Sequence, residues 1–93
     1  MVKCVVEMYG FARDASGIDE TEVVLKDAAN LHDLVAELRR KVPALEGSVI
    51  RSGEDRLIDR CAFNIDGRFY FDNDDFRLKD GCHVRLLTLA TGG

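Results

Sequence analysis

The sequence contains no tryptophan, a single proline and no long hydrophobic run. A helix that crosses a membrane needs about 20 consecutive apolar residues, and no stretch of the chain approaches that length. The N-terminal stretch from Met1 to Glu7 is apolar over too few positions for a secretory signal peptide. We therefore expect neither export nor membrane insertion.

Cysteine is also scarce, with three residues far apart at Cys4, Cys61 and Cys82. None has the C-x-x-C spacing of zinc or redox motifs, so a reduced, cytoplasmic protein is the simplest interpretation. Cys4 and Cys61 are interpreted as small buried hydrophobic residues. A persulfide on Cys82 is an alternative role for that residue. Strand alternation, however, sends Cys82 and His83 to opposite faces.

Positive charge is in the minority: 13 lysines and arginines stand against 17 acidic residues, for a net charge of −4. The longest basic run is residues 39–41, so phosphate neutralisation has little support and no nucleic-acid partner is expected. A protein partner is expected to offer a basic docking surface. His32, His83 and the acidic residues Asp72, Asp74 and Asp75 lack ligand spacing, so no metal site is expected. Residues 72–75 are interpreted as a polar, solvated turn.

The residues that are present predict five strands and one main helix. The strands are expected at residues 2–9, 21–26, 61–65, 68–71 and 82–89. Residues 11–20 are predicted to form a polar loop between the first two strands. Asp66-Gly67 is the strongest hairpin signal. The last strand is apolar on both faces, which favours a central position next to the first strand.

The helix is predicted between Asn30, a good N-cap, and Pro43, which ends it. Asp33 lies where a carboxylate favours a helix start. An apolar stripe follows at Leu31, Leu34, Val35, Leu38 and Val42. Residues 44–60 are predicted to cross over irregularly. The order β-β-α-β-β-β indicates an α+β fold, with one helix on one face of a mixed four- to five-stranded sheet.

The last two residues, Gly92 and Gly93, have no side chains to pack. A carboxylate is a poor electrophile that must be activated, usually as an acyl-adenylate, in a site that excludes water. Residues without side chains can thread a narrow channel into such a site. The pattern therefore favours an activated C-terminal carboxylate, and the competing interpretation is an idle chain end.

Four motifs occur in order along the chain: residues 10–12 after the first strand, the hairpin at 63–67, the approach to the last strand at 78–84, and the end at 91–93. In these motifs the sequence resembles the MoaD/ThiS sulfur-carrier family, and most of all the small subunit of molybdopterin synthase. The sequence departs from that subunit in lacking a Pro-Pro pair before the diglycine. It also carries Cys82 where an acidic residue is common.

The resemblance implies a ubiquitin-like β-grasp domain over residues 1–89 and a flexible diglycine tail over 90–93. It implies that an ATP-dependent activating enzyme adenylates Gly93, that a sulfur donor converts it to a thiocarboxylate, and that Gly92 allows the tail to thread. An acceptor enzyme, such as the molybdopterin synthase large subunit, would then take the sulfur. The chain would be a carrier rather than an enzyme and would need no cofactor. Because it has no nucleotide-binding motif, the ATP is expected to be bound by the partner.

Partner binding is expected from Thr91 and Ala90 in the tail, and from an apolar patch formed by Phe11, Phe76 and Leu86. The alternative for these apolar residues, and for Tyr9, is ordinary core filling.

The sequence leaves open the pathway that receives the sulfur: molybdopterin, thiamine, cysteine, a thiolated tRNA base or a tungsten cofactor. It also leaves open a ubiquitin-like modifier joined to lysines of targets, and a plain binding module.

Overall fold

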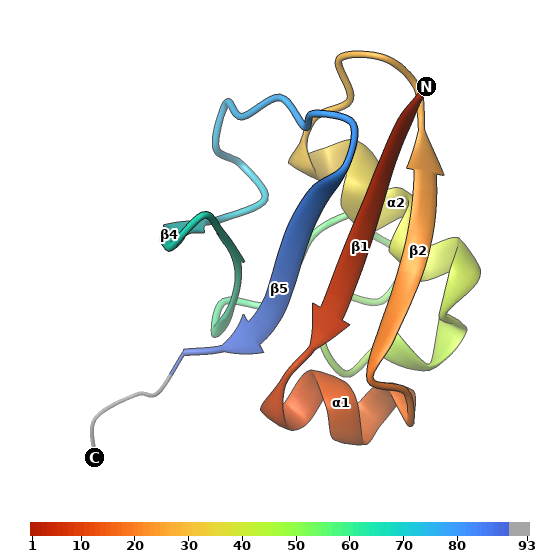
Figure 1. Cartoon of the computed structure of the whole chain (residues 1–93). Helices are drawn as coiled ribbons and strands as arrows, with labels where there is room; N and C mark the ends of the chain where they lie inside the picture. Colours follow the sequence, from red (N-terminus) through yellow and green to blue (C-terminus); the bar gives the residue numbers. More distant parts are fainter. Residues whose placement is uncertain (90–93) are drawn as a thin grey trace.

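Five strands form one sheet in the order β2-β1-β5-β3-β4, in a computed structural model that describes residues 1–89 (Figure 1). The strands are β1 (Val2–Met8), β2 (Glu20–Leu25), β3 (Cys61–Ile65), β4 (Arg68–Tyr70) and β5 (Cys82–Thr88). β1 and β5 are parallel, and the other neighbours are antiparallel. The predicted central position of the last strand, beside the first, is confirmed.

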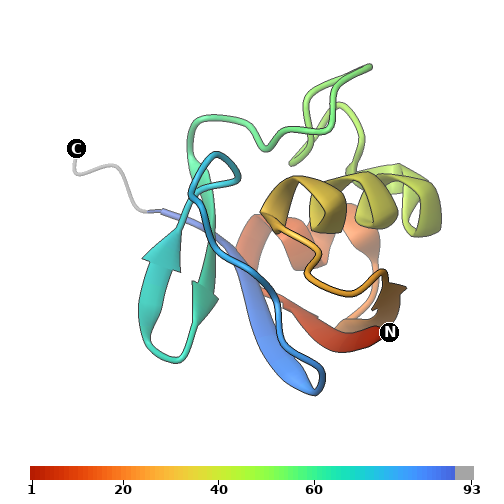
Figure 2. The same cartoon turned by 90° about the horizontal axis from the view of Figure 1, so that it is seen from above.

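One face of the sheet is covered by α2 (Leu31–Lys41), as Figure 2 shows from above. Asn30 and Asp33 form the predicted start of this helix as a capping box: the Asn30 side chain accepts from the Asp33 N–H at 2.9 Å, and the Asp33 carboxylate accepts from the Asn30 N–H at 3.0 Å. The predicted apolar stripe is buried against the sheet at Leu31, Leu34, Val35, Leu38 and Val42.

The two faces of the sheet follow the expected alternation. In β1, Val2, Cys4, Val6 and Met8 are buried in the core on the helix side, whereas Lys3 is exposed and Val5 and Glu7 are partly exposed. In β5, Val84 and Leu86 are fully buried on the helix side. His83 and Arg85 are exposed on the other side. The outer face of the sheet is therefore the broad surface that α2 leaves free.

The prediction of a polar loop at residues 11–20 is wrong, because a short helix, α1 (Gly10–Ser16), occupies most of it. Ala12 is completely buried and anchors the helix to the core. Gly17 ends it in the left-handed conformation at φ 72°, and its N–H donates to the Arg13 carbonyl. Seven residues with one buried position give too little periodicity for a helix to be recognised from sequence.

The irregular crossing predicted for residues 44–60 is confirmed. A 3-10 turn, η1 (Pro43–Leu45), begins it, and isolated β-bridges join Ile50 to Glu46 and to Leu57. Leu45, Val49 and Ile50 are fully buried, so the segment closes the core beside α2. No helix within residues 1–89 is long and apolar enough to cross a bilayer.

The acidic turn at residues 72–75 is exposed, as expected, except at its first residue. Asp72 is only 7% exposed and accepts a hydrogen bond from the Leu57 N–H. The expectation of a wholly solvated turn is therefore wrong at this position. Burial of a carboxylate requires such a partner, and the register that brings Leu57 to Asp72 depends on the tertiary structure.

Candidate functional site

The end of β5 is the part of the predicted site that the structure describes. Gly92 and Gly93, with Ala90 and Thr91, lie outside the described residues. β5 stays paired with the sheet up to its last residue. Thr88 is paired with Cys61 of β3, and the Leu89 N–H donates to the Arg60 carbonyl at 2.7 Å. The chain is therefore paired with its neighbour as far as residue 89, at the end of the central strand.

α1 begins at the same end of the sheet, because β1 runs parallel to β5 (Figure 1). The Tyr9 N–H donates to the Leu86 carbonyl at 3.0 Å and joins the start of α1 to β5. Phe11, in the first turn of α1, is 48% exposed. An aromatic side chain is therefore available to a partner near the point where β5 ends.

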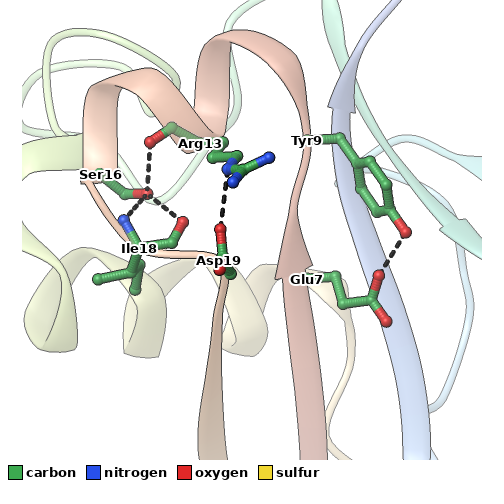
Figure 3. A network of polar contacts seen from close by, with 6 residues as sticks. All are labelled: Glu7, Tyr9, Arg13, Ser16, Ile18 and Asp19. Atoms are coloured by element: carbon green, nitrogen blue, oxygen red, sulfur yellow. Dashed lines mark hydrogen bonds and ion pairs between the residues drawn. The ribbon is translucent and has the colours of Figure 1, made fainter.

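α1 is fixed in place by polar contacts at its far end, shown in Figure 3. Arg13 forms an ion pair with Asp19 at 2.8 Å. The Ser16 hydroxyl contacts the Arg13 carbonyl, and it accepts a hydrogen bond from the Ile18 N–H at 3.3 Å. These contacts connect the helix to the start of β2, so Phe11 is presented by an anchored element.

The three apolar residues expected to form a patch do not share one surface. Phe11 is exposed, Phe76 is partly buried with its ring centroid 4.5 Å from that of Tyr70, and Leu86 is completely buried. The prediction that Leu86 belongs to an exposed patch is therefore wrong, and Leu86 instead fills the core. The reason is strand alternation: Leu86 lies on the helix face of β5.

A polar cluster on the outer face was not predicted. The Tyr9 hydroxyl donates a hydrogen bond to one carboxylate oxygen of Glu7, and Figure 3 shows these two side chains beside β5. His83 contacts the other carboxylate oxygen of Glu7. The hydrogen bond from Tyr9, assisted by the neighbouring His83 and Arg85, lowers the pKa of Glu7. The same bond to Glu7 raises the pKa of Tyr9. The β1–β5 register brings His83 and Arg85 beside Glu7, whereas Tyr9 and Glu7 are only two positions apart.

A row of register partners crosses this outer face from β4 to β1. Phe69 lies opposite Asn64, Asn64 opposite Arg85, and Arg85 opposite Glu7. Phe69 is 53% exposed at one end of the row, and a shallow apolar depression lined by Tyr9, Asn64, Arg85 and Leu87 lies along it. The alternation in residues 68–71 was the available signal for Phe69. The outer face thus combines aromatic and charged groups next to the end of β5.

The cysteines lie as the alternation predicts. Cys4 and Cys61 are buried, each about 1% exposed. Cys82 is half-buried on the helix side of β5, and His83 projects from the other face. The two side chains therefore do not act on one another.

Comparison with known proteins gives a family match over most of the chain. The family model described as ThiS family matches residues 6–93. The molybdopterin synthase sulfur carrier subunit of Chlamydomonas reinhardtii is 28% identical over 82 residues, which cover 88% of each chain.

Solved structures share the fold. A putative molybdopterin converting factor, subunit 1, from Pyrococcus furiosus superposes with a TM-score of 0.75 at 24% identity, over 97% of this chain and all of its own. The small archaeal modifier protein 1 of Haloferax volcanii superposes with a TM-score of 0.82 at 17% identity, over 97% of this chain and all of its own. These likenesses establish a β-grasp fold.

Proposed function

The chain belongs to the ThiS family, and we propose that it is a sulfur carrier whose C-terminal Gly93 is adenylated by a partner enzyme, converted to a thiocarboxylate and used as a sulfur donor. The observation that carries this proposal is that the family match continues to residue 93, through the diglycine. A match confined to the sheet and helix would support the fold alone.

The proposed chemistry needs only the terminal carboxylate of this chain. Its oxygen attacks the α-phosphorus of ATP and releases pyrophosphate. A sulfur nucleophile then attacks the acyl-adenylate carbon, and AMP leaves. The protein supplies the handle and the recognition surface, and the partner supplies the nucleotide site. Gly92 serves the threading of the tail, because a residue without a side chain lets backbone approach backbone closely.

The outer face next to β5 is proposed to dock the activating enzyme. Tyr9 is exposed there, and Phe11 is exposed in the first turn of α1, which begins at the end of the sheet where β5 ends. The net charge of −4 favours a basic surface on the partner. Ala90 and Thr91 remain proposed contacts in the tail. Phe76 would contribute through its partly exposed edge, and Leu86 only as support from the core.

Molybdopterin synthesis is the proposed destination of the sulfur, with the large subunit of molybdopterin synthase as acceptor. The Chlamydomonas relative supports this pathway through its name and its coverage. The discriminating test is complementation. A strain that lacks its own molybdopterin synthase small subunit receives this protein together with the large subunit from the same source as this protein. Restored molybdoenzyme activity, lost again when Gly93 is deleted, supports the pathway.

The matched control is a strain without its thiamine sulfur carrier. Rescue of thiamine synthesis with no rescue of molybdoenzyme activity would reassign the acceptor and leave the carrier chemistry standing. The cysteine, tRNA-thiolation and tungsten-cofactor pathways are tested in the same way, by complementation of strains that lack the sulfur carrier of each pathway.

A ubiquitin-like modifier is the second candidate, since a small archaeal modifier protein shares the fold over almost the whole chain. In that case Gly93 would form isopeptide bonds with lysines of other proteins. Gly93-dependent conjugates in denatured cell extracts, identified by tryptic peptides that retain the terminal glycine residues on lysine, would support this role. Their absence, together with sulfur transfer, favours the carrier.

A further inference from the structure

Cys4 and Cys82 lie directly opposite each other on neighbouring strands. They are register partners in the parallel pairing of β1 with β5. Their sulfur atoms are 2.7 Å apart, and both thiols are free. The contact joins residues 78 positions apart in the sequence, so only the fold brings the two sulfurs together.

The backbone around this pair is held in place. The Gly81 N–H donates to the Lys3 carbonyl at 2.7 Å, and the Lys3 N–H donates to the Asp80 carboxylate at 2.8 Å. Neighbouring strands lie about 4.7–4.9 Å apart, and the Cα atoms of disulfides are usually about 4.4–6.8 Å apart. The two cysteines therefore meet the spacing of a disulfide without movement of the strands.

We propose that Cys4 and Cys82 form a redox pair, which a peroxide converts to an intrachain disulfide and which a small thiol reduces again. The pair is independent of the sulfur chemistry proposed for Gly93. It lies at the start of β5, at the opposite end of the strand from Leu89.

The two thiols have different roles in this reaction. Cys82 is half-buried and accessible, whereas Cys4 is buried. Burial, with the hydrogen bond to Cys82, raises the pKa of Cys4 to about 12. Cys82 is therefore the thiol that meets the oxidant, and Cys4 is the one that resolves the product.

The steps balance as follows. The Cys82 thiolate attacks one oxygen of hydrogen peroxide and the O–O bond breaks, which gives a sulfenic acid and, with one proton, a water molecule. The Cys4 sulfur then attacks the Cys82 sulfur, the S–O bond breaks, and the hydroxyl leaves as water with the Cys4 proton. Both sulfurs are oxidised and the peroxide is reduced to two water molecules.

Cys61 serves as the internal control. It lies opposite Thr88, six positions along β5 from Cys82. At about 3.3 Å per residue this separates the two by roughly 20 Å, too far for a disulfide. Cys61 is also buried, which raises the pKa of its thiol and protects it from oxidation.

The test starts from fully reduced, folded full-length protein, freed of reductant and exposed to hydrogen peroxide. Free thiols are then blocked with N-ethylmaleimide under denaturing conditions, and the protein is analysed by intact mass and tryptic mapping. We expect one label, on Cys61, with about 2 Da lost through the bridge. The oxidised protein melts about 10 °C or more above the reduced form, and dithiothreitol reverses the shift.

Two variants keep the result interpretable. Cys61→Ala is expected to form the same bridge and to carry no label. Cys82→Ser, a change at the accessible partner, is expected to leave Cys4 reduced and labelled. The proposal is overturned if folded wild-type protein carries three labels after peroxide, if Cys82 stops at a sulfenic or sulfinic acid beside a labelled Cys4, or if the bridges join two chains.

Discussion

Asp72 accepts a hydrogen bond from the backbone N–H of Leu57, which connects the turn after β4 to the irregular crossing segment. Asp72 is the only buried charged side chain among the described residues. Arg56 approaches its other carboxylate oxygen at 3.9 Å but is itself half exposed. The hydrogen bond to Leu57, rather than the ion pair, therefore accounts for the burial of this carboxylate.

Asp72→Ala is expected to lower the free energy of unfolding by about 1–3 kcal/mol, because it leaves the Leu57 N–H buried without an acceptor. Asp72→Asn keeps an acceptor oxygen of the same size and is expected to lose less. Urea denaturation of the two variants measures both values. An alanine variant within about 0.5 kcal/mol of wild type would contradict the assignment.

Asn30→Ala is expected to destabilise the protein by about 0.5–2 kcal/mol, since the capping box at the start of α2 loses its side-chain acceptor. Asn30→Ser is the matched control, because a serine hydroxyl can accept from the same Asp33 N–H. Thermal unfolding followed by circular dichroism compares the two. Equal losses for alanine and serine would show that the cap contributes nothing specific.

Cys4 is expected to make the protein less stable in alkali. Its pKa is about 12 in the folded state against an ordinary value of 9.0, so the folded state keeps a proton that the unfolded state releases. The contribution of this proton to the free energy of unfolding is complete below pH 9. It is lost as the pH rises towards 12, at about 1.4 kcal/mol per pH unit. Cys4→Ala removes this dependence.

The measurement is the free energy of unfolding of both proteins at several pH values, under reducing conditions. The cavity left by alanine shifts the variant by a constant amount, so only the pH dependence of the difference matters. A difference between wild type and Cys4→Ala that stays constant from pH 8 to pH 11 would contradict the assigned pKa.

Phe11 and Leu86 are expected to separate binding from stability. Phe11→Ala removes a half-exposed side chain, so it should lower the free energy of unfolding by about 1 kcal/mol, less than a core truncation, while weakening binding to the activating enzyme. Leu86→Ala empties a fully buried site and should cost about 2–5 kcal/mol of stability. Titration calorimetry and urea denaturation provide the two readouts.

The binding measurement needs its own control. Phe69→Ala removes an equally exposed aromatic residue at the β4 edge, away from the start of α1. If Phe69→Ala weakens binding and Phe11→Ala does not, the docking surface is centred on the other edge of the outer face. Binding that does not weaken with added salt would contradict the proposed basic partner surface.

Local signals were sufficient for α2, the five strands and the Asp66-Gly67 turn. Asn30, Asp33 and Pro43 mark the helix ends by chemistry that acts within a few residues, and the two turn residues have positive φ values of 53° and 83°. The central place of β5 was predicted from its apolar residues Val84, Leu86 and Leu87, although its outer face also carries the exposed His83 and Arg85. These features depend on the chain close to each residue.

The wrong predictions concern features that are determined by tertiary structure rather than by the local sequence. α1 is held by one buried residue, Ala12, and by contacts with the start of β2. Alternation in β5 divides its residues into two sets but does not say which set faces α2, so Leu86 was placed on the wrong surface. The contacts from Glu7 to His83 and from Cys4 to Cys82 both require the parallel register of β1 and β5.

The central claim is that Gly93 becomes a thiocarboxylate. Untagged protein that ends at Gly93 is incubated with its cognate activating enzyme, ATP and a sulfide source, and its intact mass is measured beside that of a Gly93-deleted variant. Replacement of oxygen by sulfur adds about 16 Da, the same as methionine oxidation, so the gain must be confined to the protein that retains Gly93. A gain that requires ATP and Gly93 is the predicted result. An unchanged mass with a competent cognate enzyme, or an equal gain in the deleted variant, would contradict the account.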